Sequence, residues 1–273
     1  MPYYIQPSGF VLLRVIGALS LFTITYFVFV KEKIETIDIY RFAICGLFGV
    51  AINQLMFFEG LNLSTPINAS IIMTSNPILV IILSFFIIKE KLTIRKGLGV
   101  FLGIFGATNL ILNGGEINLG SDLQVGNLFV FINAISYGLY LVIVQPLMKK
   151  YKAITVMFYV FAFGLVYVLP FGFSNLSDVN WNNIPTGIYW EIAYVVVCTT
   201  FIAYLFNSEA LKKLSPSTVS IYIYFQPILA TLFAILRKSD YLDRQKVFSC
   251  IIIFLGVYLV SVRSKKTIKN KLF

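Results

Sequence analysis

The sequence predicts an all-α membrane protein, a polytopic bundle of about nine transmembrane helices arranged as two inverted repeats. Three observations predict this class. The chain of 273 residues is 58% hydrophobic and 12% charged, with a mean hydropathy of +0.85, whereas soluble globular chains carry roughly 25% charged residues. Its apolar residues form runs near the ~20 residues that a helix needs to cross a bilayer. Finally, one pattern of polar, proline and glycine residues occurs twice along the chain.

The repeat is defined by a constant separation. Five residue pairs lie 150 positions apart, namely Pro77 and Pro227, Glu90 and Asp240, Leu92 and Leu242, Lys96 and Lys246, and Gly106 and Gly256. Such regular self-similarity is typical of a duplicated structural unit. We therefore expect a first repeat over 1–115, a second repeat over 121–264 and a basic tail over 265–273.

The apolar runs are expected to be helices, because an open strand would leave backbone groups without hydrogen bonds in lipid. Taken in order, the nine expected spans are residues 8–30, 40–62, 65–88, 95–113, 125–148, 153–173, 187–211, 216–236 and 244–262.

Lysine and arginine are concentrated in alternate connections. The connections near 31–41, 89–96, 149–152 and 212–213 and the C-terminal tail are basic, whereas 61–64, 113–124 and 174–186 contain neither residue. The positive-inside rule then places the basic connections and the C-terminus in the cytoplasm, as expected for a protein of the plasma (bacterial inner) membrane. The basic turn at 237–246 falls on the outer side. It is the repeat mate of the cytoplasmic turn 89–96, which indicates that the two repeats are inverted.

Several chemistries are excluded by the residues that the chain lacks. It contains no His, no GxSxG sequence, no glycine-rich phosphate loop and no metal-ligand spacing among its three Cys, so most hydrolase, acyltransferase and ATPase schemes have no reactive group. We expect no catalytic residue, no metal and no cofactor, so that the protein is not an enzyme. The net charge of +10 is better explained by orientation in the bilayer than by binding to nucleic acid.

Two side-chain amides each precede a proline inside an apolar helix, at Asn76-Pro77 and Gln226-Pro227. Proline removes a backbone hydrogen bond, and broken helices persist at membrane depth where protein or a watery cavity satisfies the freed groups. Interrupted helices at matching points of two repeats are typical of transporter binding sites. We therefore expect Asn76 and Gln226 to line a central cavity, with a packing kink as the alternative.

Further polar residues extend this candidate cavity. Helical spacing places Thr218 and Tyr222 on the face of Gln226, and puts Asn133, Ser136, Tyr137 and Tyr140 on one face of their own span. Asn53 and Gln54 are adjacent, so that one of the two is expected to face the cavity. Hydrogen bonding between helices stays open as the alternative role. Besides Asn76 and Gln226, the candidates for the cavity wall are therefore Asn68, Thr218, Tyr222, Gln54, Asn133, Tyr137 and Tyr140.

Two charged residues lie at similar depth in the first two spans. Arg14 is about two turns from the outer end of its span, and Glu59 is near the outer end of the next. Because an isolated charge at that depth is costly, we expect an ion pair between Arg14 and Glu59.

The doubled pattern resembles the EamA-like branch of the drug/metabolite transporter (DMT) superfamily. The resemblance rests on Pro77-Ile78 with Glu90 and Gly106, and on Pro227-Ile228 with Asp240 and Gly256, and it covers nearly the whole chain. It implies a ten-helix fold of two inverted five-helix halves, both termini in the cytoplasm, a central cavity and alternating access. The family mostly moves small metabolites, often amino acids or related solutes, and many members export them. The chain departs from it with Asp at 240 and with nine spans.

We accordingly expect a secondary transporter, an exporter of a small organic metabolite such as an amino acid. The alternative is a membrane binding or scaffold protein that retains the fold without transport.

We also expect that the first helix is missing from this chain. The segment from Tyr151 to Gly164 resembles that from Tyr4 to Gly17, so the second repeat has one helix before this segment that the first repeat lacks. A truncated reading frame explains this better than a natural nine-helix protein.

Overall fold

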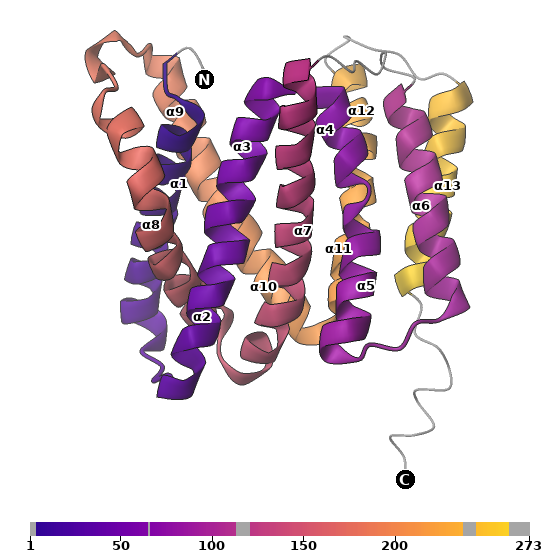
Figure 1. Cartoon of the computed structure of the whole chain (residues 1–273), viewed down its shortest axis with the longest axis horizontal. Coiled ribbons are helices and arrows are strands. Elements are labelled where there is room, and N and C mark those ends of the chain that lie inside the picture. The colour runs from indigo at the N-terminus through magenta and orange to yellow at the C-terminus, as the bar shows by residue number, and fades with distance from the viewer. Residues whose placement is uncertain (1–3, 65, 113–120, 237–243, 262–273) are drawn as a thin grey trace.

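The computed structural model describes residues 4–64, 66–112, 121–236 and 244–261. These residues are helical and contain no strand, which confirms the predicted all-α class. In Figure 1 the helices run side by side across the molecule. Five helical segments in the described part of the chain are long and apolar enough to cross a membrane, namely Pro7–Val30, Thr36–Leu63, Leu123–Lys150, Ala153–Ser177 and Thr186–Lys213. The count of nine crossings stays a prediction.

The first half of the chain forms α1 to α6. Their bounds are α1 Pro7–Thr25, α2 Ile39–Gly46, α3 Asn53–Leu63, α4 Pro66–Met73, α5 Asn76–Ile88 and α6 Ile94–Leu112. A π-helical segment, Leu47–Ile52, joins α2 to α3 without a break, and another, Tyr26–Val30, extends α1.

The second half forms α7 to α13. Their bounds are α7 Ser121–Lys150, α8 Ala153–Ser177, α9 Thr186–Tyr194, α10 Ala203–Lys213, α11 Pro216–Ser220, α12 Phe225–Leu236 and α13 Arg244–Ser261. Here a π-helical segment, Val195–Ile202, joins α9 to α10, as Leu47–Ile52 joins α2 to α3.

Both prolines interrupt their helices at the predicted places. In the first copy α4 ends at Met73 and α5 begins at Asn76, with Pro77 in its first turn. The carbonyl of Ser75 accepts the backbone N–H groups of Ile78 and Leu79, at 3.0 and 3.1 Å, and so closes the first turn of α5. In the second copy the 3₁₀ turn Ile221–Tyr224 separates α11 from α12, which contains Pro227.

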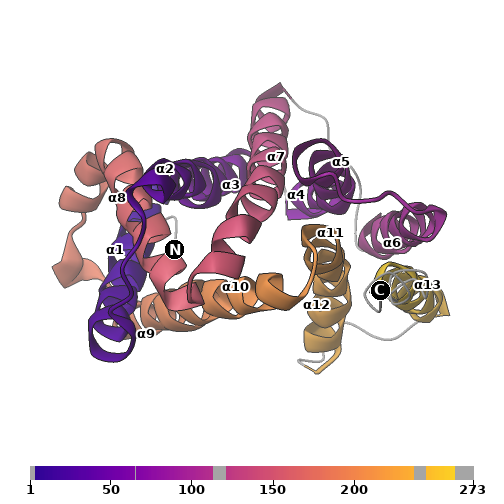
Figure 2. The ribbon, with the colours of Figure 1, turned by 90° about the horizontal axis from the view of Figure 1, so that it is seen from below.

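Seen end-on, the bundle has a pair of long helices at each end and α7 near its middle (Figure 2). At one end α1 packs along α8, and at the other α6 packs along α13. The inner helix α7 packs against α3 and α5. The largest apolar cluster joins α1, α2, α7 and α8 around Phe22, Phe42, Met157 and Phe161.

The repeated glycines allow α6 and α13 to touch through their backbones. A Cβ atom at Gly256 would lie 2.6 Å from the carbonyl oxygen of Gly99, and one at Gly106 would lie 2.9 Å from that of Ser249. These two contacts are equivalent under the 150-residue separation, since Gly99 corresponds to Ser249 and Gly106 to Gly256. Small residues at such positions are what lets membrane helices approach closely.

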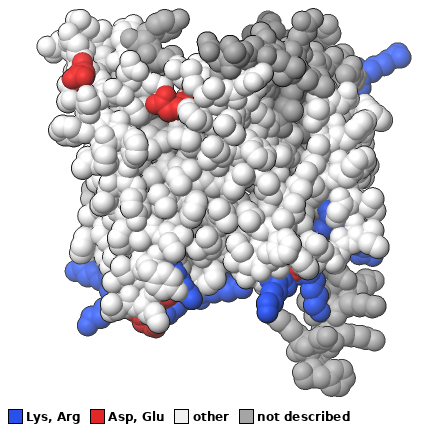
Figure 3. Space-filling model, in the orientation of Figure 1, with Lys and Arg blue, Asp and Glu red and all other residues white. Residues whose placement is uncertain are grey.

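Figure 3 shows that the charged residues on the visible face gather at the edges and leave a wide uncharged band between them. Most of the Lys and Arg side chains on this face lie along its lower edge. One cluster joins the start of α2 to the end of α7, where Lys150 pairs with Glu35 at 2.6 Å and with Asp38 at 2.5 Å. The band and the apolar helices are those of an integral membrane protein.

Candidate functional site

Polar contacts hold α7 against the first half of the chain. Asn133 Nδ2 donates to the carbonyl of Asn53 at 2.6 Å, and Ser136 Oγ donates to that of Phe48 at 2.6 Å. Phe48 lies in the π-helical segment Leu47–Ile52, a type of segment that is frequent at functional sites. On the neighbouring helix, Asn76 Nδ2 donates to the carbonyl of Ala134 at 3.1 Å. The amides of Asn133 and Asn76 therefore fix α7 between α3 and α5.

The hydroxyl of Tyr204 connects the two halves. It donates to the carbonyl of Gly49 at 3.1 Å and accepts Gln54 Nε2 at 3.3 Å. Nearby, Asn207 Nδ2 donates to the hydroxyl of Tyr137 at 2.7 Å. The same hydroxyl also donates to Asn53 Oδ1 at 3.4 Å. Both side chains of the adjacent pair at 53 and 54 are thus joined to α10, although only one of the two was expected to face the cavity.

We call these side chains, from α3, α5, α7 and α10, the central polar layer: Gln54, Asn76, Asn133, Tyr137, Tyr204 and Asn207. Four amide oxygens of the layer are buried and accept no hydrogen bond from the described residues, namely those of Gln54, Asn76, Asn133 and Asn207. An unpaired buried acceptor costs about 1–3 kcal/mol. The layer can therefore accept hydrogen bonds from a bound donor.

Tyr204 and Asn207 were not among the sequence candidates. A signal for Tyr204 existed, because it lies 150 residues after Gln54 and is therefore its repeat mate. The two mates contact each other. Tyr224 and Thr74, also 150 residues apart, likewise meet, with the Tyr224 hydroxyl donating to the Thr74 carbonyl at 3.0 Å.

The other candidates occupy different surroundings. Tyr140 is buried and its hydroxyl contacts Met157 Sδ at 3.9 Å, toward α8. Asn68 is buried in α4. Thr218 belongs to the N-terminal cap of α11, where its backbone N–H donates to Ser215 Oγ at 3.3 Å. Tyr222 is 48% exposed and stacks on Phe225, so Thr218 and Tyr222 lie apart from the central polar layer.

The two candidate amides Asn76 and Gln226 differ strongly in burial. Asn76 is completely buried under α7, whereas Gln226 is exposed. The structure therefore does not bring Gln226 into one cavity with Asn76, as the sequence had led us to expect, because no described helix covers the second copy as α7 covers the first.

The difference in burial between the two copies also holds for a whole membrane span. Thr36–Leu63 and Thr186–Lys213 are repeat mates of equal length and hydropathy, but 44% of the most apolar stretch of the first is buried against 6% for the second. Asn53, which accepts a bond from α7, corresponds to the exposed Ala203. The expected missing helix stays a prediction, and this uncovered face is where the repeat would place it.

Arg14 and Glu59 do not form the expected ion pair. Arg14 Nε donates to Thr200 Oγ1 at 3.1 Å, and its guanidinium lies 4.8 Å from the ring centre of Phe58. The carboxylate of Glu59 lies instead near the backbone N–H of Ser8. Residue 59 is turned about 100° around its helix from residue 58, and Phe58 is the residue that faces Arg14.

A polar contact joins the two copies at the basic edge, which is the edge of the bundle where most of the visible Lys and Arg side chains lie (Figure 3). Glu90, in the connection after α5, pairs with Lys96 and accepts Ser217 Oγ from α11 at 2.6 Å. Burial raises the pKa of this carboxyl, but the bonds from Lys96, Ser217 and Ser215 outweigh it and hold the pKa below its ordinary value. Its repeat mate Asp240 lies outside the described residues.

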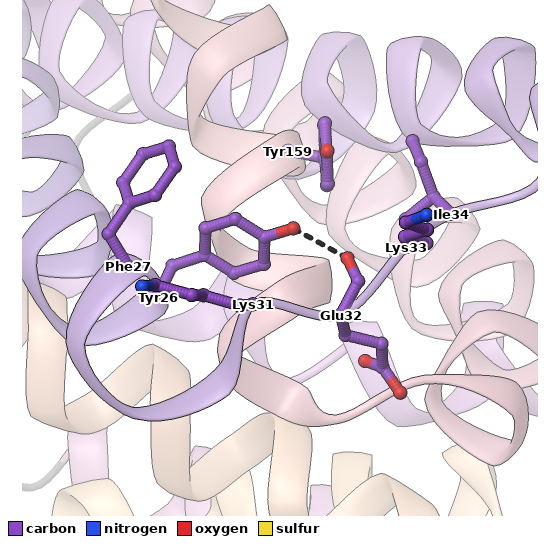
Figure 4. Close-up of a pocket in the computed structure, with 7 residues that line it drawn as sticks. All are labelled: Tyr26, Phe27, Lys31, Glu32, Lys33, Ile34 and Tyr159. Carbon is purple, nitrogen blue, oxygen red and sulfur yellow. Dashed lines mark hydrogen bonds between the residues drawn. The ribbon is translucent and has the colours of Figure 1, made fainter.

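A surface hollow of about 550 Å³ lies near the connection between α1 and α2 (Figure 4). Tyr26, Tyr159 and Lys31 are among its lining residues, and the Tyr26 hydroxyl donates to the carbonyl of Glu32 at 2.5 Å. None of the residues of the central polar layer lines it. Within the described parts of the chain, no three His, Cys, Asp or Glu side chains are grouped to hold a metal ion.

Comparisons with known proteins give a family, related transporters and a structure of similar fold. The model of the EamA-like transporter family matches residues 1–112 and 124–262. An uncharacterized transporter of Bacillus subtilis, YyaM, is 25% identical over 222 residues, which are 81% of this chain and 72% of that protein. An uncharacterized transporter of Archaeoglobus fulgidus is 26% identical over 225 residues, 81% of this chain and 75% of its own length. One solved crystal structure superimposes with a TM-score of 0.78 at 16% identity, covering 94% of this chain and 89% of that one.

Proposed function

The chain belongs to the EamA-like transporter family, and from this membership we propose that it is a secondary transporter that exports a small organic metabolite, such as an amino acid or a related solute. The related proteins of Bacillus subtilis and Archaeoglobus fulgidus are named as transporters. The membrane orientation follows the basic edge. We place that edge and the C-terminus in the cytoplasm, and the protein in the plasma membrane.

The single observation that carries the proposal is the central polar layer. Its four amide oxygens without a donor come from helices of both predicted repeats. Few structural roles require buried acceptors that stay unpaired, since each one costs free energy. A solute that donates hydrogen bonds would satisfy these oxygens and would lie between the two repeats, where transporters with inverted repeats bind their substrates.

Alternating access is supported by the broken helices and by the contact at Glu90. The interruption at Pro77 and the 3₁₀ turn before Pro227 divide each span into two segments that can tilt separately. The bond from Ser217 to Glu90 joins α11 to the end of α5 at the basic edge. We propose that this contact closes the cytoplasmic side and breaks when the cavity opens toward the cytoplasm.

Transport is tested with purified protein in sealed proteoliposomes loaded with a broad panel of labelled metabolites. The proposal expects release of at least one solute above that from empty liposomes. Export is tested separately by comparing right-side-out with inside-out membrane vesicles.

A pair of asparagine variants locates the site. Asn207→Ala removes a member of the central polar layer, so the flux should fall. Asn175→Ala is the matched control, because Asn175 Nδ2 makes one comparable bond, at 2.6 Å to Ser8 Oγ, outside the layer. If no solute of the panel crosses, the protein is the non-transporting binding protein. Equal loss of flux in both variants would place the site elsewhere.

A further inference from the structure

The surface hollow beside α1 lies where an apolar span meets the basic edge. The span Pro7–Val30 ends directly before Lys31, which is one of the lining residues. Figure 4 shows that most of the lining comes from the end of α1 and the connection after it, and that Tyr159 adds a wall from α8. The volume of about 550 Å³ is within the range of about 300–1,000 Å³ that is usual for small-molecule sites.

The carboxylates of this connection are bonded to other parts of the chain. Glu32 accepts the backbone N–H of Lys152 at 2.9 Å, so its carboxylate is held at the start of α8. Glu35 and Asp38 both pair with Lys150, at 2.6 and 2.5 Å. None of these three acidic side chains therefore forms an ion pair within the hollow.

Two lysines of the hollow keep an uncompensated charge. Lys31 and Lys33 both line it and both are exposed. Neither takes part in the ion pairs that the described residues form. Each ammonium group carries three N–H donors and no acceptor. The polar side of the hollow is therefore suited to an anion.

The other side of the hollow is aromatic and continues into the membrane. Tyr26 stacks on Phe158 with the ring centres 4.7 Å apart, and the ring centre of Tyr159 is 6.1 Å from that of Tyr26. Amphipathic rings of this kind are typical of the headgroup level of a bilayer. Next to them, Phe27 and Phe29 are 53% and 73% exposed near the end of the apolar span. The cationic part thus adjoins an apolar surface that faces lipid.

This combination is complementary to a lipid with a negative headgroup. Basic pockets at the cytoplasmic ends of membrane helices bind such headgroups. We propose that the hollow binds an anionic phospholipid of the cytoplasmic leaflet, with Lys31 and Lys33 at its phosphodiester and the exposed rings of Phe27 and Phe29 along its acyl chains. A free phosphate ion would use the lysines alone and would leave the aromatic side without a role. The inference does not depend on the proposed transport function.

The chain offers a matched control for this site. The sequence Lys-Glu-Lys of residues 31–33 occurs again at 89–91, in the connection after α5. Each begins with a lysine in the left-handed conformation, with φ 45° at Lys31 and φ 53° at Lys89. In both, the glutamate is bonded elsewhere, while the two lysines are exposed and form no ion pair with the described residues. Residues 89–91 do not line the hollow, so the two sequences offer equal charge and differ in the surface beside it.

The test measures lipid binding to the protein purified in a neutral detergent. Native mass spectrometry gives the dissociation constant of the most tightly bound lipid as phosphatidylglycerol or phosphatidylcholine is titrated. Phosphatidylcholine keeps the phosphodiester and the acyl chains but adds a compensating cation. Because a lysine near an anionic lipid is worth about fivefold in affinity, the wild type should prefer phosphatidylglycerol on the order of 30-fold.

Two double variants separate the hollow from general attraction to the basic edge. Lys31→Gln with Lys33→Gln should remove the preference for phosphatidylglycerol. Lys89→Gln with Lys91→Gln loses the same charge outside the hollow and should keep the preference. If the first double variant does not fold, the single variants Lys31→Gln and Lys33→Gln replace it, with an expected loss of about fivefold each.

Each result either supports the lipid site or overturns it. Equal affinity of the wild type for the two lipids overturns it, because the lysines would then contribute nothing to recognition. Equal weakening by the two double variants overturns it as well, since the charge of the edge alone would explain the binding. Displacement of phosphatidylglycerol by inorganic phosphate would assign the hollow to a free anion. Transport is not part of the readout, so the outcome is independent of whether the chain moves a solute.

Discussion

The contact between α6 and α13 makes a quantitative prediction for Gly256→Ala. The added Cβ atom would lie 2.6 Å from the Gly99 carbonyl oxygen and 2.8 Å from the Gly103 nitrogen. Ordinary Cβ contacts begin at 3.4 Å, so the helices would have to separate by about 0.8 Å. Both obstacles are backbone atoms, and a change of rotamer cannot remove them.

The expected cost follows from two opposing effects. Overpacking of this kind costs about 1–3 kcal/mol, while replacing a helical Gly by Ala gains about 0.5–1 kcal/mol. We therefore expect Gly256→Ala to lower the free energy of unfolding by about 1–2 kcal/mol. Gly97→Ala is the matched control in α6, because a Cβ atom there has no other atom within 4 Å. Gly97→Ala should therefore gain the helix stability of alanine without any steric clash.

The measurement is unfolding in detergent micelles, followed by helical circular dichroism as denaturant is added to the wild type and the two variants. The expected order of stability is Gly97→Ala, wild type, Gly256→Ala. Equal stability of the two variants would show that α6 and α13 do not approach through their backbones, and the explanation given for the repeated glycine would be wrong.

Three further outcomes are expected. Asn76→Leu loses its bond to α7 but also removes the unpaired buried oxygen of the same amide, so the free energy of unfolding should change by less than about 1 kcal/mol while transport falls in the proteoliposome assay; Gln226→Leu, at an exposed position, should change neither. Tyr204→Phe removes the donor to Gly49 and the acceptor of Gln54, and should cost about 1–3 kcal/mol and lower transport in the proteoliposome assay; an unchanged flux would contradict a role in the site. The pKa of Glu90 is lowered in the folded protein, so its stabilising contribution is present above the ordinary pKa of a glutamate, about 4.3, and is lost as pH falls through the lower folded value. The protection of the amides at the start of α11, measured as the exchange rate relative to the intrinsic rate at the same pH, should therefore fall on acidification in the wild type and should respond less in Glu90→Gln.

The sequence was sufficient to predict the class, the five long apolar spans of the described chain and the two helix breaks, because hydropathy and proline act locally. It also found four members of the central polar layer, Gln54, Asn76, Asn133 and Tyr137, since an amide or a polar–aromatic face is unusual inside an apolar span. It missed Asn207, which lies close to the basic end of its span. That position is typical of a solvated side chain.

The predictions that failed concern the direction in which a side chain points from its helix and the element that packs against it. The spacing along the chain does not show which side chain of the second span meets Arg14, since only tertiary packing decides that it is Phe58. Thr218 has the spacing of a cavity residue, yet its place in the first turn of α11 makes it part of a cap. Gln226 has the same local pattern as Asn76 and a different environment, because α7 covers one copy and no described helix covers the other.

The contacts between repeat mates have a consequence for the direction in which a solute would bind. If an axis relates residue n to residue n + 150, a group on that axis meets its own counterpart, as Gln54 meets Tyr204 and Thr74 meets Tyr224. Identical mates would present the same groups from both directions, and a solute could bind in two opposite poses. Here an amide faces a phenol and a threonine backbone faces another phenol, so the two poses differ in energy. Divergence of the mates thus makes the two ends of the central polar layer chemically different, so that the proposed site would favour one direction of binding, which a scaffold of identical repeats would not.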